Sequence, residues 1–138
     1  MQKYFTQRQE IQIPQERPHV NLNVNNFDEE IEKLSKNYTI HRKEEVKEFI
    51  KIHPELIPYI NKITPIINCY FPNYQKCITF FEDYEFEELN DISIYINSTE
   101  KTFEKDCKIF DELLTTILKM NEIPTEIKRL VSMDLWSI

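Results

Sequence analysis

The sequence predicts an α+β fold in which a small antiparallel sheet of two or three strands has helices packed on one face. Two strand-like segments and the amphipathic helix after them indicate this fold. Residues 76–81 read Lys-Cys-Ile-Thr-Phe-Phe and are rich in β-branched and aromatic side chains, as strands are. In residues 91–97, Ile92, Ile94 and Ile96 alternate with polar or aromatic side chains, so one face of this strand is expected to be buried.

The helix expected after the second strand begins near Asn97-Ser98-Thr99, because these residue types commonly cap helices. Its apolar residues recur at spacings of four, three, four and three, which places them in one stripe along an α-helix. They are Phe103, Cys107, Phe110, Leu114 and Ile117. Charged residues occupy most of the other face, so we expect the stripe to lie across the isoleucine face of the two strands.

Weaker patterns predict the elements on either side of this centre. Helices are expected over residues 26–34, 42–52 and 126–133, and residues 37–41 are expected to form a connection. A further helix is expected over about residues 55–70, broken or kinked because Pro58 and Pro65 each remove a backbone donor. Residues 19–25 alternate between apolar and polar side chains and are a candidate third strand.

The chain of 138 residues is expected to form a single α+β domain over residues 26–138. Residues 1–25 are expected to be a polar N-terminal arm with a candidate edge strand. The last residues are unusually apolar and allow two interpretations. They either pack back on the core or dock on a partner, in which case Trp136 is the expected anchor.

The composition excludes several classes of enzyme. The chain has no glycine, whereas phosphate-binding loops and dinucleotide fingerprints need glycine where the backbone approaches phosphate. A Gly-x-Ser-x-Gly nucleophile turn is excluded for the same reason. Alanine is also absent, and isoleucine, lysine, asparagine and tyrosine are abundant, which is typical of an AT-rich genome.

Net charge and hydropathy limit the kinds of partner and the compartment that we expect. The net charge is −7, and an acidic surface repels phosphates, so we expect no nucleic-acid partner. The charge favours a basic protein partner, or serves only solubility. No apolar run is long enough to span a membrane, and no signal peptide is evident. We therefore expect a cytoplasmic protein without membrane contact.

Cysteine and histidine spacing predicts no metal site and no cofactor. The three cysteines, Cys69, Cys77 and Cys107, are too far apart for a paired metal or redox motif. Cys77 and Cys107 fall on apolar faces and are expected to be small core residues. No two histidines are spaced four residues apart, the spacing that would place both on one face of a helix.

The most distinctive polar feature is the acidic connection between the two strands, residues 82–90. With Asp91 it brings together six carboxylates, and aromatic and apolar residues alternate with them. The candidate binding residues are Glu82, Asp83, Tyr84, Glu85, Phe86, Glu87 and Glu88, together with Trp136. A run of charge is most often a solvated loop. It also suits a basic protein surface, through steering by charge and anchoring by rings, or a metal or acid–base site built from carboxylates.

Residues 42–118 carry a recognisable order of elements. Glu45-Val46-Lys47-Glu48-Phe49-Ile50 is followed by His53-Pro54-Glu55-Leu56-Ile57-Pro58, a Tyr70-Phe71-Pro72 turn, the two strands, and Asn97-Ser98-Thr99-Glu100 at the start of a helix. In this order the chain resembles a family of uncharacterised small acidic prokaryotic proteins. The resemblance implies the order of elements but no activity, so it assigns no functional residue.

These observations give three hypotheses for function. The first is a non-enzymatic interaction protein of the antitoxin, immunity or inhibitor type that covers a basic protein with its acidic face. The second is an enzyme that uses the carboxylates of residues 82–91, with or without a metal. The third is a structural subunit that forms homo-oligomers through the open sheet edge or the terminal helix.

Overall fold

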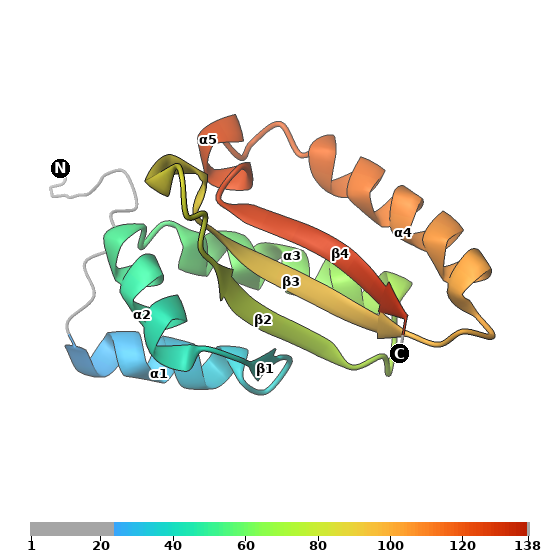
Figure 1. The fold of residues 1–138 in the computed structure, drawn as a ribbon, viewed down its shortest axis with the longest axis horizontal. Coiled ribbons are helices and arrows are strands. Elements are labelled where there is room, and N and C mark those ends of the chain that lie inside the picture. Colours follow the sequence, from blue (N-terminus) through green and yellow to red (C-terminus); the bar gives the residue numbers. More distant parts are fainter. Residues whose placement is uncertain (1–23, 138) are drawn as a thin grey trace, which may run out of the picture.

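The computed structural model describes residues 24–137, which form five α-helices, one short 3₁₀ helix and a four-stranded sheet (Figure 1). The helices are α1 Val24–Leu34, α2 Lys43–Ile52, α3 Leu56–Tyr70, α4 Phe103–Leu118 and α5 Thr125–Lys128. The strands are β1 Thr39–Ile40, β2 Lys76–Phe81, β3 Asp91–Ser98 and β4 Val131–Ser137. The α+β class predicted from the sequence is therefore confirmed.

The sheet is mixed, with the order β1-β2-β3-β4. β2 and β3 pair antiparallel, as predicted, with Ile78 opposite Ile94. The outer strands each pair parallel, β1 with β2 and β4 with β3. The prediction of an antiparallel sheet of two or three strands was wrong in this respect. A parallel neighbour needs a crossover, which α2 and α3 supply on one side and α4 and α5 on the other.

Two segments became strands although the sequence pattern favoured other structures. Residues 39–40, expected in a connection, form β1, which is too short to show any periodicity. Of the helix expected over residues 126–133, only α5 forms, and the chain then enters β4. In β4, Val131, Met133 and Leu135 stand opposite the three isoleucines of β3, so this register extends the apolar face of the sheet.

The prolines of α3 do not break the helix. Pro58 lies in its first turn, where no intrahelical amide bond is required. Pro65 lies inside the helix and leaves the carbonyl of Asn61 without its usual donor, but both residues are exposed, so water can reach that carbonyl. Of the two outcomes expected for residues 55–70, a broken or a kinked helix, the break does not occur, because α3 is continuous over Leu56–Tyr70. The predicted N-terminal arm, residues 1–25, and its candidate strand, residues 19–25, lie outside the described residues except for residues 24 and 25. These two residues belong to α1.

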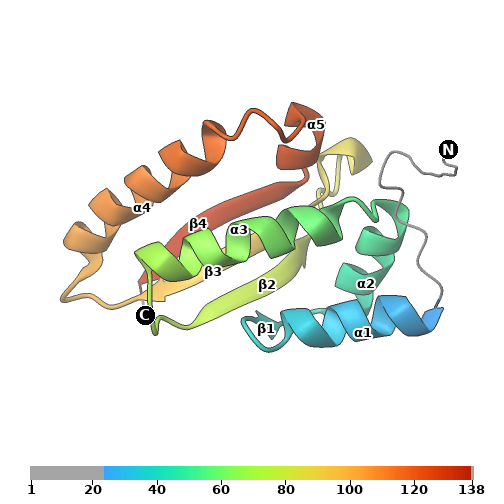
Figure 2. The same cartoon turned by 180° about the vertical axis from the view of Figure 1, so that it is seen from behind.

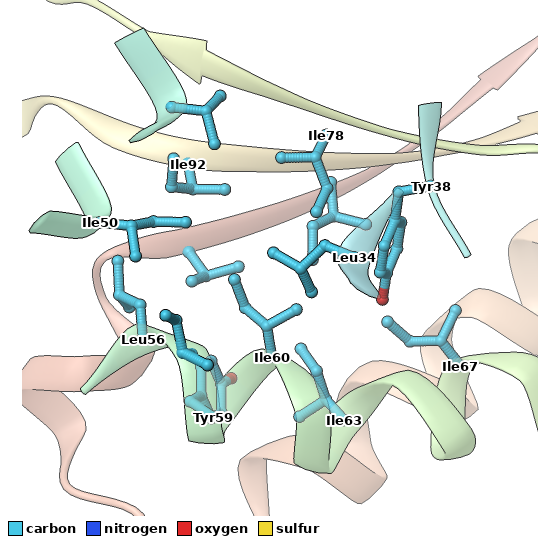
Figure 3. Close-up of a cluster of buried hydrophobic side chains, with 14 of the residues drawn as sticks. Leu34, Tyr38, Ile50, Leu56, Tyr59, Ile60, Ile63, Ile67, Ile78 and Ile92 are labelled. Atoms are coloured by element: carbon cyan, nitrogen blue, oxygen red, sulfur yellow. The ribbon is translucent and has the colours of Figure 1, made fainter. Parts of the chain in front are cut away.

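The helices cover one face of the sheet, and the main core lies between α3 and the strands (Figure 2). α3 directs Ile60, Ile63 and Ile67 toward Ile78 and Ile92 (Figure 3). All five side chains are fully buried. The helix predicted to cross the isoleucine face, α4, instead packs against α3 and β4, and α3 takes the central place.

A buried carboxylate fixes the start of α4. Asp106 is 0% exposed, and it accepts hydrogen bonds from Ser98 Oγ at 2.6 Å, Thr102 Oγ1 at 2.9 Å and the Tyr74 hydroxyl at 2.9 Å. These donors come from the end of β3, the turn before α4 and the turn before β2. The residues expected to cap the helix, 97–99, end β3 instead, and the helix begins at Phe103.

Hydrogen bonding also sets the ionisation of this group. Burial by itself raises the pKa of Asp106, but the hydroxyl groups of Ser98, Tyr74 and Thr102 outweigh it. The pKa of Asp106 therefore lies below its ordinary value, and the carboxyl is charged at neutral pH.

We expect Asp106→Ala to lower the free energy of unfolding by about 2–4 kcal/mol, because the buried hydroxyl group of Ser98 and the half-buried hydroxyl groups of Tyr74 and Thr102 lose their acceptor. Urea unfolding followed by circular dichroism measures this loss. Asp111→Ala is the matched control, because Asp111 is exposed on the same helix, and its loss is expected to stay below about 0.5 kcal/mol. Equal losses in the two variants would contradict the role assigned to Asp106.

The lowered pKa also predicts a dependence on pH. A carboxyl whose folded-state pKa is depressed stabilises the fold above its unfolded-state pKa of about 4, and this contribution is lost as the pH falls through the folded-state value. The unfolding free energy of the wild type should therefore fall more steeply below pH 4 than that of Asp106→Asn. Urea titrations at several pH values between 7 and 2.5 measure both slopes, and parallel slopes would contradict the prediction.

Candidate protein-binding site

The acidic connection, residues 82–90, is an ordered loop between β2 and β3. Asp83 Oδ1 accepts the backbone amides of Glu85 at 2.9 Å and Phe86 at 2.8 Å. Asn90 Oδ1 in turn accepts the amide of Asp83 at 2.7 Å. A 3₁₀ turn, Glu87–Leu89, completes the loop. Asp83 thus holds the loop in shape, while the neighbouring glutamates point outward.

The loop exposes apolar surface as well as charge. Tyr84 is 94% exposed, and Phe86 and Leu89 are each more than half exposed. Glu82, Glu85, Glu87 and Glu88 are exposed beside them. Large apolar side chains in water commonly mark an interaction surface when they are clustered, so the loop meets one requirement of a docking site.

Helix α2 lies beside this loop and adds a second row of acids. Its Val46, Phe49 and Ile50 are buried. The outward positions of the same helix carry Glu44, Glu45 and Glu48. The helical period thus separates a core face from an acidic face.

A groove of about 420 Å³ lies between α2 and the connection, and we call it the acidic groove. It is lined by Glu44, Glu45, Glu48, Phe49, Ile52, Phe80, Glu87 and Asn90. The rings of Phe49, which is buried, and Phe80, which is half-buried, lie 5.5 Å apart and form the apolar floor. The four glutamates form the rim, and Ile52, 71% exposed, lies at one end of α2.

One cation of the chain already shows how this site can hold a guanidinium group. The guanidinium carbon of Arg42 lies 5.4 Å from the centre of the Phe80 ring. Its Nη1 donates to the Phe80 carbonyl at 3.3 Å, and its Nη2 lies 3.5 Å from Glu45 and 3.7 Å from Glu82. The flat cation therefore lies over an aromatic ring with carboxylates near its edges, a favourable arrangement for arginine.

The rim keeps an excess of negative charge. Within residues 24–137, no lysine or arginine nitrogen lies within 4 Å of a carboxylate oxygen of Glu44 or Glu87. Glu48 is paired with Lys51 at 3.6 Å, an exposed contact of small energy. Among the described residues, Glu44 and Glu87 of the acidic groove therefore have no basic partner, and an added cation can meet their carboxylates there.

The predicted binding residues fall into two separate places. Glu82 to Glu88 lie together in the connection, at the end of the sheet where β3 begins. Trp136 stands opposite Asn97 near the other end of β3 and packs on Tyr95, with ring centres 4.9 Å apart. The structure thus does not bring Trp136 to the acidic connection.

The sequence reasoning missed Phe80 and the three glutamates of α2 as members of this site. The acidic face of α2 is visible in the spacing of residues 44, 45 and 48. Its place beside the connection is not, because it follows from the parallel pairing of β1 with β2, which carries α2 across the sheet.

Residues 24–137 contain neither a cluster of metal ligands nor a helix that could span a membrane. In this part of the chain no three histidine, cysteine or carboxylate side chains are grouped as metal ligands. None of its helices has the length and apolar character needed to cross a membrane.

Comparison with protein-family models finds no matching family, and comparisons with curated proteins and with solved structures find no significant similarity. The resemblance of residues 42–118 to small acidic prokaryotic proteins therefore stays a prediction.

We expect Asp83→Ala to loosen the connection, because the amides of Glu85 and Phe86 lose their acceptor. Loss of about 1–2 kcal/mol of local stability corresponds to roughly 5–30-fold faster hydrogen exchange at these two amides. Exchange measured by NMR tests this, with Glu88→Ala as the control that alters an outward-pointing acid of the same loop. Unchanged exchange in Asp83→Ala would show that the side chain does not hold the loop.

Proposed function

We propose that this protein is a non-enzymatic interaction protein of the antitoxin, immunity or inhibitor type, which binds a basic protein partner through the acidic groove. The observation that carries this proposal is the combination of an aromatic floor with a rim of four glutamates. A solvated acidic loop needs only the charge. The floor adds apolar contact at the same place, which a docking site requires.

The chemistry of the groove fits a lysine or arginine side chain of the partner. The aliphatic stem of such a residue packs on Phe80 and Ile52, and its charged end meets Glu44 or Glu87. The contact of the Arg42 guanidinium with the Phe80 ring supports this proposal, because it places a basic side chain on the same ring. Exposed rim charges mainly speed and orient association, while the buried stem supplies affinity.

The exposed apolar residues of the connection extend this surface. Tyr84, Phe86 and Leu89 surround the acids of the loop, so a partner that enters the groove is positioned to cover them as well. Truncating a tyrosine that is a hot spot at the centre of an interface costs about 2 kcal/mol or more of binding free energy. We infer that these residues anchor the partner once charge has brought it close.

The other two hypotheses have different relations to the same residues. An enzyme built on the connection would need carboxylates available for chemistry, yet Asp83 is bonded to loop amides and Glu82 lies beside Arg42. No observation favours this alternative over docking. Self-association would use the open sheet edge or the terminal segment and not the acidic groove.

We expect a charge-reversal variant, Glu44→Lys with Glu48→Lys and Glu87→Lys, to lose the partner in an affinity pull-down from native cells analysed by mass spectrometry. The matched control reverses Glu100, Glu104 and Glu112, which are exposed outside the groove. Each reversal adds two positive charges, which takes both variants from a net charge of −7 to −1. Any difference between the variants then reports the place of the charge and not its amount.

A stoichiometric basic protein retained by the wild type and by the control variant, and lost by the groove variant, is the expected result. Its binding should also weaken with rising salt, because the rim charges are exposed. Ile52→Ser should weaken it further without any change in charge. Equal retention by both charge variants would refute the groove as the binding surface.

A further inference from the structure

Residues 1–9 of the sequence have a chemistry that complements the acidic groove. They read Met-Gln-Lys-Tyr-Phe-Thr-Gln-Arg-Gln and carry two cations and two aromatic rings but no carboxylate. We call them the basic segment. The groove offers the opposite set, carboxylates around an aromatic floor. Lys3 and Arg8 can therefore meet the glutamates, while Tyr4 and Phe5 can cover the exposed apolar surface beside them.

Charge is divided unevenly along the chain. Residues 1–23 contain three basic and two acidic side chains, a net charge of +1, so the remaining 24–138 carry −8 of the total of −7. Opposite charges attract two parts of one chain as they attract two molecules. At the rim of the groove, Glu44 and Glu87 have no basic partner among the described residues. The basic segment supplies the cations that these two carboxylates lack.

Contacts between α1 and α2 bring the beginning of α1 close to the groove. Three pairs join the two helices: Phe27 with Lys51, Asp28 with Lys47, and Glu32 with Lys43. The numbers rise along α1 as they fall along α2, so the helices lie side by side in opposite directions (Figures 1 and 2). The start of α1 therefore lies beside the end of α2. Ile52, at that end, lines the groove.

The part of the chain between the basic segment and α1 is long enough to reach the groove. Lys51, which contacts α1, also pairs with Glu48 on the rim at 3.6 Å, so the two regions are neighbours on the surface of α2. A helix is about 10–12 Å across. Residues 10–23 span up to about 46–50 Å when extended. The reach therefore exceeds the width of α2 several times.

We propose that the basic segment binds in the acidic groove of its own chain and covers it until a partner displaces it. The displacement rests on the proposed function, whereas the binding of the segment needs no partner. Covalent linkage gives such a segment an effective concentration of about millimolar at a site within its reach. A contact too weak to join two separate molecules can therefore still cover the groove, and the same linkage favours the groove of the same chain over that of a second copy.

Nuclear Overhauser effects in the full chain test this binding directly. We expect contacts between the ring protons of Tyr4 or Phe5 and the methyl groups of Ile52, which is 71% exposed in the described part of the chain. The contacts should persist on dilution, because they form within one molecule. They should weaken with rising salt, because the charges of the rim are exposed.

Two charge variants test the cause of the contact. The segment variant is Lys3→Gln with Arg8→Gln, and we expect it to lose the contacts with Ile52. The charge control is Lys36→Gln with Lys119→Gln, at exposed positions that do not line the groove, and it should keep them. Each variant removes two positive charges and changes the net charge from −7 to −9. Circular dichroism checks that both variants fold.

A synthetic peptide with the sequence of residues 1–9 measures how fully the segment covers the groove. In the wild type and in the charge control this peptide must compete with the linked copy. We therefore expect it to bind the segment variant about three- to tenfold more tightly than either of them. The groove variant Glu44→Lys with Glu48→Lys and Glu87→Lys should not bind it.

Three results would overturn the proposal. The first is a wild type without contacts between the basic segment and Ile52. The second is equal binding of the peptide by the wild type and the segment variant, because the groove is then already open. The third is a set of contacts that disappears on dilution, which places the segment in the groove of a second copy.

The pull-down separates this proposal from the proposed function. If the segment competes with a partner, the segment variant should retain severalfold more of that partner than the wild type does. A partner that the groove variant loses, but that the wild type and the segment variant retain equally, refutes the competition and leaves the proposed function in place. Contacts with Ile52 in a chain that retains no partner support the binding of the segment and count against the proposed function.

Discussion

The carboxylate of Asp106 is the contact on which the arrangement of α4 and its neighbours depends. This charged group is buried away from water, and hydrogen bonds from three hydroxyl groups of different segments offset the free-energy cost of burying it. Ser98 is the last residue of β3 and Thr102 immediately precedes α4. Both donate hydrogen bonds to the Asp106 carboxylate, which therefore fixes the turn between the strand and the helix. Tyr74 connects the turn before β2 to the same carboxylate, and its ring packs in a T-shaped arrangement with the buried ring of Phe71. Because α4 begins the crossover to β4, the place of the last strand follows from this cluster.

The opposite end of the antiparallel pair is also held by a side-chain carboxylate, but in a different setting. Asp83 binds loop amides at the surface, whereas Asp106 binds hydroxyl groups in the interior. Hydrogen bonds to a carboxylate thus stabilise both ends of the pair β2 and β3, and buried isoleucines pack on its middle. The acidic groove lies at one end of this pair, where α2 stands beside the connection.

The elements that the sequence predicted well are those with a strong period. Ile92, Ile94 and Ile96 alternate without exception, and the apolar stripe of α4 repeats over four turns. β4 was missed although Val131, Met133 and Leu135 also alternate, because the preceding Pro124 and Thr125 are good residues for the start of a helix. The two residues of β1 have no period at all, and their pairing with β2 is decided by packing between distant segments.

The candidate site divides in the same way. The acids and rings of residues 82–88 are adjacent in the chain, so their cluster was visible at once. Phe80 was assigned to a strand, and its partly exposed ring became part of a groove only when α2 crossed beside it. Trp136 was expected to join a partner-binding surface, and no property of its own segment indicates which end of the sheet it occupies. Both outcomes depend on parallel pairing, which no local pattern specifies.

The absence of glycine has a consequence for the backbone of this chain. Among the described residues, Arg42 and Asn73 adopt positive φ angles of 51° and 67°, a region where glycine is normally used. Asparagine tolerates that region, whereas for arginine it costs about 1 kcal/mol, which the ring, carbonyl and carboxylate contacts of Arg42 offset. In return, the unfolded chain lacks its most flexible residue type at every position. Each residue therefore has fewer unfolded conformations to lose than a glycine would have. The composition thus lowers the conformational entropy that is lost on folding, in addition to the stability that native contacts give.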